Sequence, residues 1–189
     1  MNPSSKAIFN RAELLLGADV MDRLASVRVI VFGVGGVGSW CAEALVRTGV
    51  THITLVDADC VAPSNINRQR MATVSSVGRP KVEILKELLL DINPEASIEA
   101  VQARFTDASA ADFALETYDY VIDAIDALSD KAALILHATA KPAVFFSSMG
   151  AACKVDPTHV RVTSFWEVRG CPLGAMLRKK LRKAGTLPS

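Results

Sequence analysis

The fold of this chain is decided by the segment Val27-Arg28-Val29-Ile30-Val31-Phe32-Gly33-Val34-Gly35-Gly36-Val37-Gly38. Residues 27–32 form an apolar run broken only by Arg28, which is typical of a buried central strand in a parallel sheet. The glycines that follow fit the pattern G-x-G-x-x-G, and residues 39–48 then have the character of a helix that ends at Gly49. A strand, a glycine loop and a helix in this order predict a nucleotide-binding α/β domain.

The rest of the chain alternates strand-like apolar runs with amphipathic segments, which indicates a mostly parallel sheet flanked by helices. We therefore expect a Rossmann-like, doubly wound sheet. Its strands are expected at residues 27–32, 52–56, 97–103, 120–124 and 143–148. Helices are expected at 39–48, from Pro80 to the stop at Asn93-Pro94, at 108–116, at 129–139 and in a basic final segment around 178–183.

Past Gly150 the pattern changes, and Lys154–Val155 and His159–Ser164 flank the turn Asp156-Pro157. This arrangement predicts a short antiparallel extension near the C-terminus. We expect residues 1–189 to form one nucleotide-binding domain, with a helical segment at 1–26, a core at 27–150 and a C-terminal extension at 151–189.

The composition suits one compact domain and argues against several classes of protein. Half of the 189 residues are hydrophobic, and charged residues make up 22% with a net charge of +1. This balance indicates no strongly charged partner, although a local basic patch still allows RNA binding. Residues 1–6 are polar, unlike a signal peptide, and no apolar run is long enough to span a bilayer, so we expect a cytoplasmic protein without membrane contact.

The four cysteines are scattered, without any C-x-x-C pair. This spacing argues against a structural zinc site and against a thioredoxin-like redox pair. We expect reduced thiols and no zinc at Cys41, Cys60, Cys153 and Cys171.

The glycine loop predicts a phosphate site, because glycines let the backbone approach a phosphate while the helix N-terminus supplies free N–H groups and partial positive charge. The glycines of the pattern are Gly33, Gly35, Gly36 and Gly38. Asp57 ends the next strand, where a carboxylate accepts hydrogen bonds from ribose hydroxyls. The loop and the acid do not distinguish ATP from a nicotinamide dinucleotide.

Further polar residues follow strand ends at the edge where doubly wound sheets bind ligands. They are Asn65, Arg68, Lys81 and Asp126. Cleavage of ATP between its α and β phosphates builds negative charge that Arg68 and Lys81 can neutralise, and Asp126 can hold Mg²⁺ against the phosphates. Hydride transfer needs no such cluster, so these residues favour a triphosphate over a dinucleotide.

Taken together, the motifs of this chain resemble those of the ThiF/MoeB/ubiquitin-activating-enzyme superfamily. The ordered motifs are Gly33-x-Gly35-Gly36-Val37-Gly38, Asp57-x-Asp59, Asn65-x-x-Arg68-Gln69, Gly78-x-Pro80-Lys81 and Asp123-x-x-Asp126. Within the superfamily the chain is most similar to the members that modify threonylcarbamoyladenosine in tRNA. That closer similarity lies in residues 11–17, 43–49, 121–126 and 156–158.

The resemblance implies an enzyme that adenylates the carboxylate of threonylcarbamoyladenosine in tRNA and then closes a ring with loss of AMP. It implies ATP and Mg²⁺ as cofactors, and nucleotide contacts from Gly33, Gly35, Gly36, Gly38, Asp57, Asp59, Asn65, Arg68, Lys81 and Asp126. The catalytic residues it implies are Arg68, Lys81, Asp126, which also holds the metal, and Arg11, which relatives contribute across a homodimer interface. A surface role for Arg11 stays open.

Other functions remain open. Some relatives adenylate the C-terminus of a sulfur-carrier or ubiquitin-like protein, but they often carry two C-x-x-C zinc pairs, which are absent here; a sulfur-transfer partner stays possible. An NAD-dependent oxidoreductase and a non-catalytic nucleotide-binding scaffold are further alternatives.

Two features depart from the family pattern. Relatives run some tens of residues further, so we expect this chain to be shortened and to lack part of the substrate site. Cys171-Pro172-Leu173 stands where relatives usually have Asp-Pro-Leu, which leaves a reactive thiol or a chance replacement as readings of Cys171. Two interpretations remain open for the basic residues around 178–183: contact with tRNA phosphates, or a helix face exposed to solvent.

Overall fold

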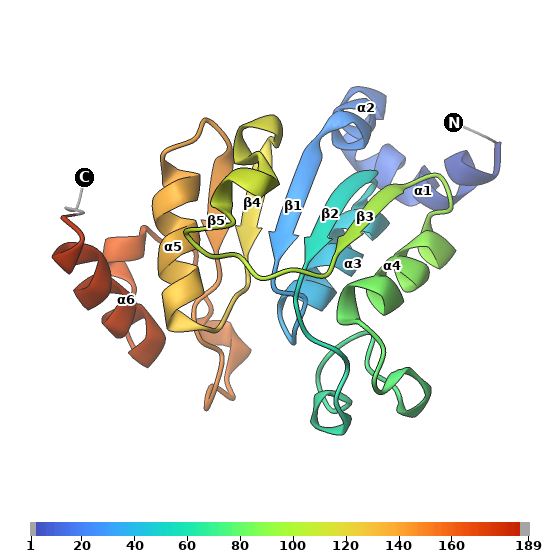
Figure 1. Ribbon diagram of the computed structural model, residues 1–189. Helices are drawn as coiled ribbons and strands as arrows, with labels where there is room; N and C mark the ends of the chain where they lie inside the picture. Colours follow the sequence, from blue (N-terminus) through green and yellow to red (C-terminus); the bar gives the residue numbers. More distant parts are fainter. Residues whose placement is uncertain (1–2, 186–189) are drawn as a thin grey trace.

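The computed structural model describes residues 3–185 and centres on an all-parallel sheet in the order β3-β2-β1-β4-β5 (Figure 1). The strands are β1 (Arg28–Phe32), β2 (His52–Val56), β3 (Ser97–Val101), β4 (Tyr120–Asp123) and β5 (Val144–Ser147). From β1 the chain adds strands outward on one side and then returns to add β4 and β5 on the other. This order confirms the expected Rossmann-like, doubly wound sheet.

Helices cover both faces of the sheet. They are α1 (Pro3–Leu16), α2 (Ala18–Ser26), α3 (Gly38–Thr48), α4 (Lys81–Ile92), α5 (Leu128–Thr139) and α6 (Pro172–Lys183). In Figure 1, α3 and α4 lie behind β1–β3, whereas α5 lies in front of β4 and β5, with α6 packed on α5. Within residues 3–185, no helix combines the length and the apolar character that a membrane crossing requires.

The central strand β1 has two buried faces because its successive side chains point in opposite directions. Val29 and Val31 pack into a core with α3 and α4, whereas Ile30 and Phe32 pack into a second core with α5. Burying each such side chain contributes about 1.5–3 kcal/mol to stability. The uninterrupted apolar run therefore follows from burial on both sides, as the sequence predicted.

The register brings the carboxyl ends of the strands to one level. Phe32 of β1 pairs with Val56 of β2 and with Asp123 of β4, and Asp123 pairs in turn with Ser147 of β5. The segments that follow these residues therefore leave the sheet side by side. Polar residues far apart in the sequence meet at this edge.

The helix expected at 108–116 was wrong. The structure has two short 3-10 helices there, Ala110–Phe113 and Leu115–Thr117, separated by Ala114 with a left-handed φ of 41°. Phe113 and Leu115 both enter the core beneath β1. In a regular helix, residues two positions apart, such as Phe113 and Leu115, would point to different faces. Burial of both side chains therefore outweighs the local preference for an α-helix.

The expected antiparallel extension was also wrong, since the structure has no strand among the described residues after Ser147. Pro157–His159 forms a 3-10 helix in which the Asp156 carboxylate accepts the Thr158 N–H at 2.9 Å. Val155, Val160 and Val162 are between 80% and 96% exposed. Without a buried face, alternating valines do not stabilise a two-stranded ribbon.

We predict that Gly38→Ala destabilises the fold while Gly35→Ala does not. A Cβ on Gly38 would lie 1.8 Å from the Gly33 carbonyl oxygen, whereas a Cβ on Gly35 would only meet Gln69 Nε2 at 3.7 Å. Forcing an atom into packed backbone costs about 1–3 kcal/mol or more. Urea unfolding measures both free energies, and equal values for the two variants would contradict this account.

Candidate functional site

The glycine loop between β1 and α3 packs directly on the turn that follows β4. Gly33 has a left-handed φ of 82°, and a Cβ there would lie 2.7 Å from the Ala124 carbonyl oxygen. Only glycine combines that conformation with this approach. The loop lies at the point where the strand order reverses, and it opens the α3 helix, whose N-terminus favours an anion.

Asp57 is held against the glycine loop. Its Oδ2 accepts the Val34 N–H at 2.8 Å, and its Oδ1 accepts the Asp59 N–H at 2.9 Å. A carboxylate has about four lone-pair sites, so acceptors remain for the two hydroxyls of a ribose. The structure thus places Asp57 at the glycine loop, and its binding of a ribose stays a prediction.

Lys81, the first residue of α4, is 6% exposed and faces the two acids that follow β2. Its Nζ lies 2.7 Å from Asp59 Oδ2 and 3.9 Å from Asp57 Oδ1. The Lys81 N–H also donates to the Asp59 carbonyl at 3.0 Å, which pins the start of α4. The structure thus brings Lys81 to Asp57 and Asp59, which precede it by more than twenty positions in the sequence.

The segment between β2 and α4 folds back over the glycine loop. A Cβ on Gly36 would lie 3.3 Å from Arg68 Cγ, and Arg68 Nη1 donates to the Ser64 carbonyl and Asn67 Oδ1, each at 3.0 Å. Asn65 Oδ1 accepts the Ala62 N–H at 2.9 Å and so closes the preceding turn. The exposed guanidinium of Arg68 therefore lies at the glycine loop, as predicted, while Asn65 shapes the segment.

Asp126 is exposed and follows Ala124, the residue on which Gly33 packs. In residues 3–185, no three His, Cys, Asp or Glu side chains gather in a way that would hold a metal ion. Mg²⁺ is commonly bound by one or two carboxylates together with substrate phosphates and water. An exposed carboxylate on the turn against which the glycine loop packs is compatible with a metal that arrives with a nucleotide.

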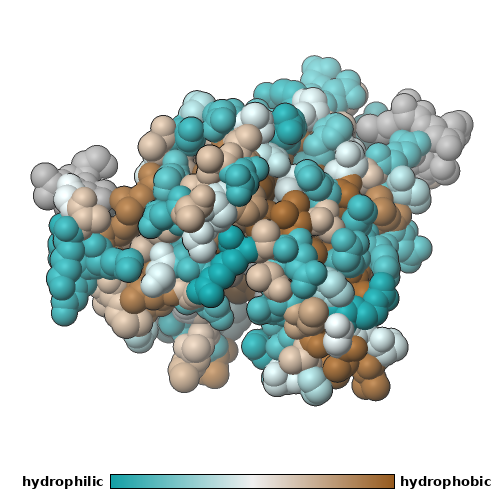
Figure 2. Space-filling model, viewed as in Figure 1, coloured by the Kyte–Doolittle hydropathy of each residue, from teal (hydrophilic) through white to brown (hydrophobic). Residues whose placement is uncertain are grey.

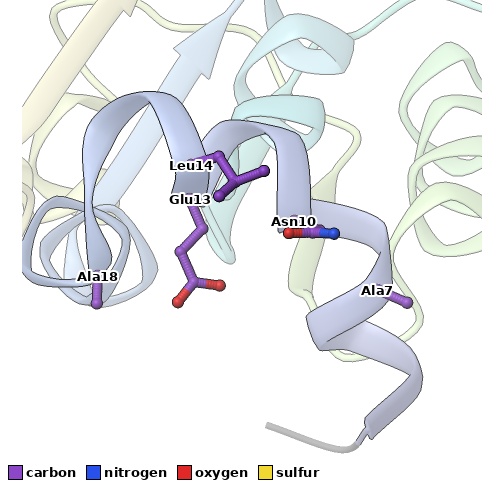
Figure 3. Close-up of a pocket in the computed structure, with 5 residues that line it drawn as sticks. All are labelled: Ala7, Asn10, Glu13, Leu14 and Ala18. Carbon is purple, nitrogen blue, oxygen red and sulfur yellow. The ribbon is translucent and has the colours of Figure 1, made fainter.

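Arg11 lies apart from these residues within the chain. It is exposed on α1, and its neighbour Phe9 packs near Gly49, at the end of α3 remote from the glycine loop. A shallow hollow of about 630 Å³ lies on α1 and α2, and Figure 3 shows the Glu13 side chain extending beside it. Its lining residues are Ala7, Asn10, Glu13, Leu14 and Ala18, none of which belongs to the strand-end site.

Comparison with known proteins assigns the chain to a family. Residues 9–185 match the ThiF family, a range that includes the glycine loop, the polar segment and the turn after β4. This chain belongs to the ThiF family.

The relatives of this ThiF chain include two bacterial enzymes. The Bacillus subtilis (strain 168) protein named tRNA threonylcarbamoyladenosine dehydratase is 42% identical over 94% of this chain and 70% of its own length. The Escherichia coli (strain K12) protein of the same name is 39% identical over 92% of this chain and 65% of its own length.

Among solved structures, the E. coli tRNA N6-threonylcarbamoyladenosine dehydratase TcdA in complex with ATP is 36% identical, with a TM-score of 0.96. The similarity covers 100% of this chain and 78% of that chain. The ThiF chain therefore spans between 65% and 78% of the length of these relatives.

The sequence did not predict a buried ion pair that lies under this site of the ThiF chain. Lys131 Nζ is 2.8 Å from Asp123 Oδ2, and both side chains are 0% exposed. Ser147 Oγ donates to the same Oδ2 at 2.7 Å, and the Ile125 N–H donates to Oδ1 at 3.0 Å. Burial raises the pKa of the Asp123 carboxyl and lowers the pKa of the Lys131 ammonium, and their mutual attraction opposes both shifts.

This pair fixes the turn that leads from β4 to Asp126. The only sign of this pair in the sequence is Lys131, a lysine among apolar residues near the start of α5. Its partner, Asp123, lies on β4 and is not indicated by local spacing. Gln69 is a second residue to which the sequence gave no role. It is 7% exposed and places Nε2 near Gly35, so it belongs to the floor of the glycine loop.

Cys171 caps the start of α6, where its Sγ accepts the Gly174 N–H at 3.3 Å. Burial by itself raises the pKa of the Cys171 thiol, but the Gly174 N–H and the charge of Lys154 bring the net pKa below its ordinary value. The side chain is 7% exposed. Cys171 therefore caps α6 in the way that Ser, Asp or Asn caps many other helices.

We predict that Lys131→Ala unfolds the ThiF chain far more readily than Lys141→Ala. Removing the Lys131 ammonium leaves the Asp123 carboxylate buried without its partner, which costs about 3–5 kcal/mol. Lys141 instead pairs with Glu116 across an exposed surface, where ion pairs contribute little. Chemical denaturation compares the two, and similar losses of stability would refute the importance of burial here.

Proposed function

We propose that this chain is an ATP-dependent enzyme that adenylates the carboxylate of threonylcarbamoyladenosine in tRNA and then cyclises it. The observation that carries the proposal is the meeting of Asp57, Arg68 and Lys81 around one glycine loop. The names of the two bacterial relatives and the ATP complex of the E. coli enzyme support the choice of substrates.

In the proposed first step, a carboxylate oxygen of the substrate attacks the α-phosphorus of ATP. The bond from that phosphorus to the bridging oxygen breaks, and pyrophosphate leaves with the electron pair. In the second step, the carbamoyl group of the same side chain attacks the activated carbonyl and gives up an N–H proton to solvent, a ring closes, and AMP departs with the former carboxylate oxygen and the electron pair of the broken bond. The substrate has then lost the elements of water, while ATP has become AMP and pyrophosphate.

Each residue of the site has a proposed role that follows from its position. The glycine loop and the N-terminus of α3 face the phosphates, and Asp57 binds the ribose. Arg68 and Lys81 neutralise charge on the triphosphate, with Asn65 shaping their segment and Asp59 orienting the Lys81 ammonium. Most of the catalytic effect then comes from positioning and electrostatic stabilisation rather than from a protein nucleophile.

Mg²⁺ fits this site when held by Asp126 together with phosphate oxygens and water, and it supplies charge neutralisation at the leaving pyrophosphate. We also propose that Arg11 acts in a homodimer, because within its own chain α1 packs away from the glycine loop. One ATP-binding domain in the cytoplasm, with tRNA as its partner, completes the proposal.

The basic end of α6 is the proposed contact with tRNA phosphates. Figure 2 shows hydrophilic surface over this helix at the left edge of the molecule. Arg182 lies over the Trp166 ring at 5.4 Å, and Arg178 Nη1 donates to the Val168 carbonyl at 2.8 Å, so both side chains are partly ordered by the protein. The exposed basic residues of this stretch are Lys179, Lys180, Arg182 and Lys183.

We predict that Arg68→Ala and Lys81→Ala each lower kcat/KM for pyrophosphate release by roughly 10²–10³-fold, because each removes charge stabilisation from the transition state. The assay contains ATP, Mg²⁺ and tRNA bearing threonylcarbamoyladenosine. Arg79→Ala is the matched control, since its exposed guanidinium pairs with Glu87 on the outer side of α4. Activity that survives in both site variants would exclude this mechanism.

The same assay separates the alternative functions. Pyrophosphate exchange driven only by a carrier protein would assign the chain to carrier adenylation, and preferential binding of NAD⁺ over Mg²⁺-ATP would assign it to the oxidoreductases. A scaffold would release no pyrophosphate with any substrate. Mass spectrometry of tRNA nucleosides from cells that lack the gene gives an independent readout, where the open threonylcarbamoyl form should accumulate.

A further inference from the structure

A set of contacts joins α3 to residues 62–70, the part of the β2–α4 connection that carries Arg68 and that we call the Arg68 segment. The nucleotide site does not by itself require these contacts. Arg70 Nε lies 2.5 Å from Glu43 Oε2, and the Arg70 guanidinium lies 5.6 Å from the centre of the Trp40 ring. The Arg70 N–H donates to Ser39 Oγ at 3.1 Å. Trp40 Nε1–H donates to the Arg68 carbonyl at 3.0 Å.

These contacts all end on the first two turns of α3. Ser39, Trp40 and Glu43 lie within five positions after Gly38, and Ser39 Oγ also donates to the Gly35 carbonyl at 2.6 Å. The partners of Arg70 are therefore parts of the same rigid unit as the glycine loop. A side chain bound to this unit is located relative to the phosphates of a bound nucleotide.

The side-chain hydrogen bonds of Arg68 do not fix its position relative to the glycine loop. Its guanidinium donates to Ser64 and Asn67, which belong to the same segment and move with it. On one side of Arg68 the segment is anchored by Met71, 1% exposed; on the other side Ile66 is 39% exposed. Contacts with α3 therefore place Arg68 relative to the glycine loop.

We propose that Arg70 is a positioning residue, which ties the Arg68 segment to α3 and so holds the Arg68 guanidinium over the glycine loop. The inference rests on the proposed function, in which Arg68 neutralises the triphosphate. Arg70 suits this task because its guanidinium makes an ion pair with the Glu43 carboxylate and a cation–π contact with the Trp40 ring. The Glu43 side chain is 9% exposed, so the pair is little screened by solvent.

Glu43 offers a matched control within the same cluster. Its Oε1 pairs with Arg47 Nε at 2.7 Å, one helical turn further along α3. Arg47→Ala removes one partner of the buried carboxylate without touching the Arg68 segment, whereas Arg70→Ala removes the other partner together with the ion pair and the Trp40 contact, and leaves the Ser39 and Trp40 hydrogen bonds to the backbone in place. In each variant Glu43 keeps one arginine, so neither leaves an unpaired buried charge.

The first test is hydrogen–deuterium exchange of the peptide that spans residues 62–69. We expect Arg70→Ala to speed exchange in this peptide several-fold and Arg47→Ala to leave it unchanged. Equal exchange in the two variants overturns the proposal whatever the catalytic activity.

The second test is pyrophosphate release with ATP, Mg²⁺ and tRNA bearing threonylcarbamoyladenosine. We expect Arg70→Ala to lower kcat/KM about 10–100-fold, since small misplacement of a catalytic group is costly, and Arg47→Ala to remain close to the unaltered chain. The double variant of Arg68→Ala and Arg70→Ala should lose no more than Arg68→Ala alone, because a positioning residue acts through the residue that it positions.

The outcomes of the second test separate the two proposals. Additive losses in the double variant would show a general structural effect and overturn the positioning role. If the unaltered chain releases no pyrophosphate although Arg70→Ala speeds exchange, the proposed function fails, and the link between the segment and α3 stands.

Discussion

The close approach of the glycine loop to the turn after β4 is the constraint on which the site depends. Gly33 meets the Ala124 backbone, and Gly38 meets the Gly33 carbonyl, at distances that leave no room for a side chain. This contact brings the N-terminus of α3 to the edge where β1 and β4 both end. Because Asp57 then hydrogen-bonds the same loop and lies beside Lys81, the acidic and basic side chains that follow β2 converge there.

Two buried lysines show how position in the fold separates a structural charge from the charge that we propose to contact ATP. Lys131 is enclosed together with Asp123 and stabilises the turn beneath the site, where no substrate reaches. Lys81 is nearly as buried, but Asp59, its closest partner, has a side chain that is 70% exposed. A charge that is shared with an exposed carboxylate is available to a phosphate, whereas a charge sealed inside is not. Burial alone would not distinguish the two residues.

The sequence predicted the parts of the fold that burial on both sides imposes. The run at 27–32 and the glycine pattern specify β1, the loop and α3 because few other structures bury that run and use those glycines. The predictions for segments 108–116 and 154–164 were wrong for a common reason: each segment has only two or three large apolar residues, too few to determine a period. In the first segment tertiary contacts chose 3-10 turns, and in the second no core was present to pair the valines.

For the site, the sequence by itself determined which residue types follow which strands: Asp57 after β2, Lys81 at the start of α4, and Asp126 after β4. Parallel strands end at one edge, so these residues were expected at one edge of the sheet, and Asp57 and Lys81 do meet there. Only the tertiary structure decided that Lys131 pairs with Asp123 and that Arg70 joins Glu43 and Trp40. Those contacts depend on how α5 packs on β4 and how the polar segment folds back on α3, and neither distance is encoded in local spacing.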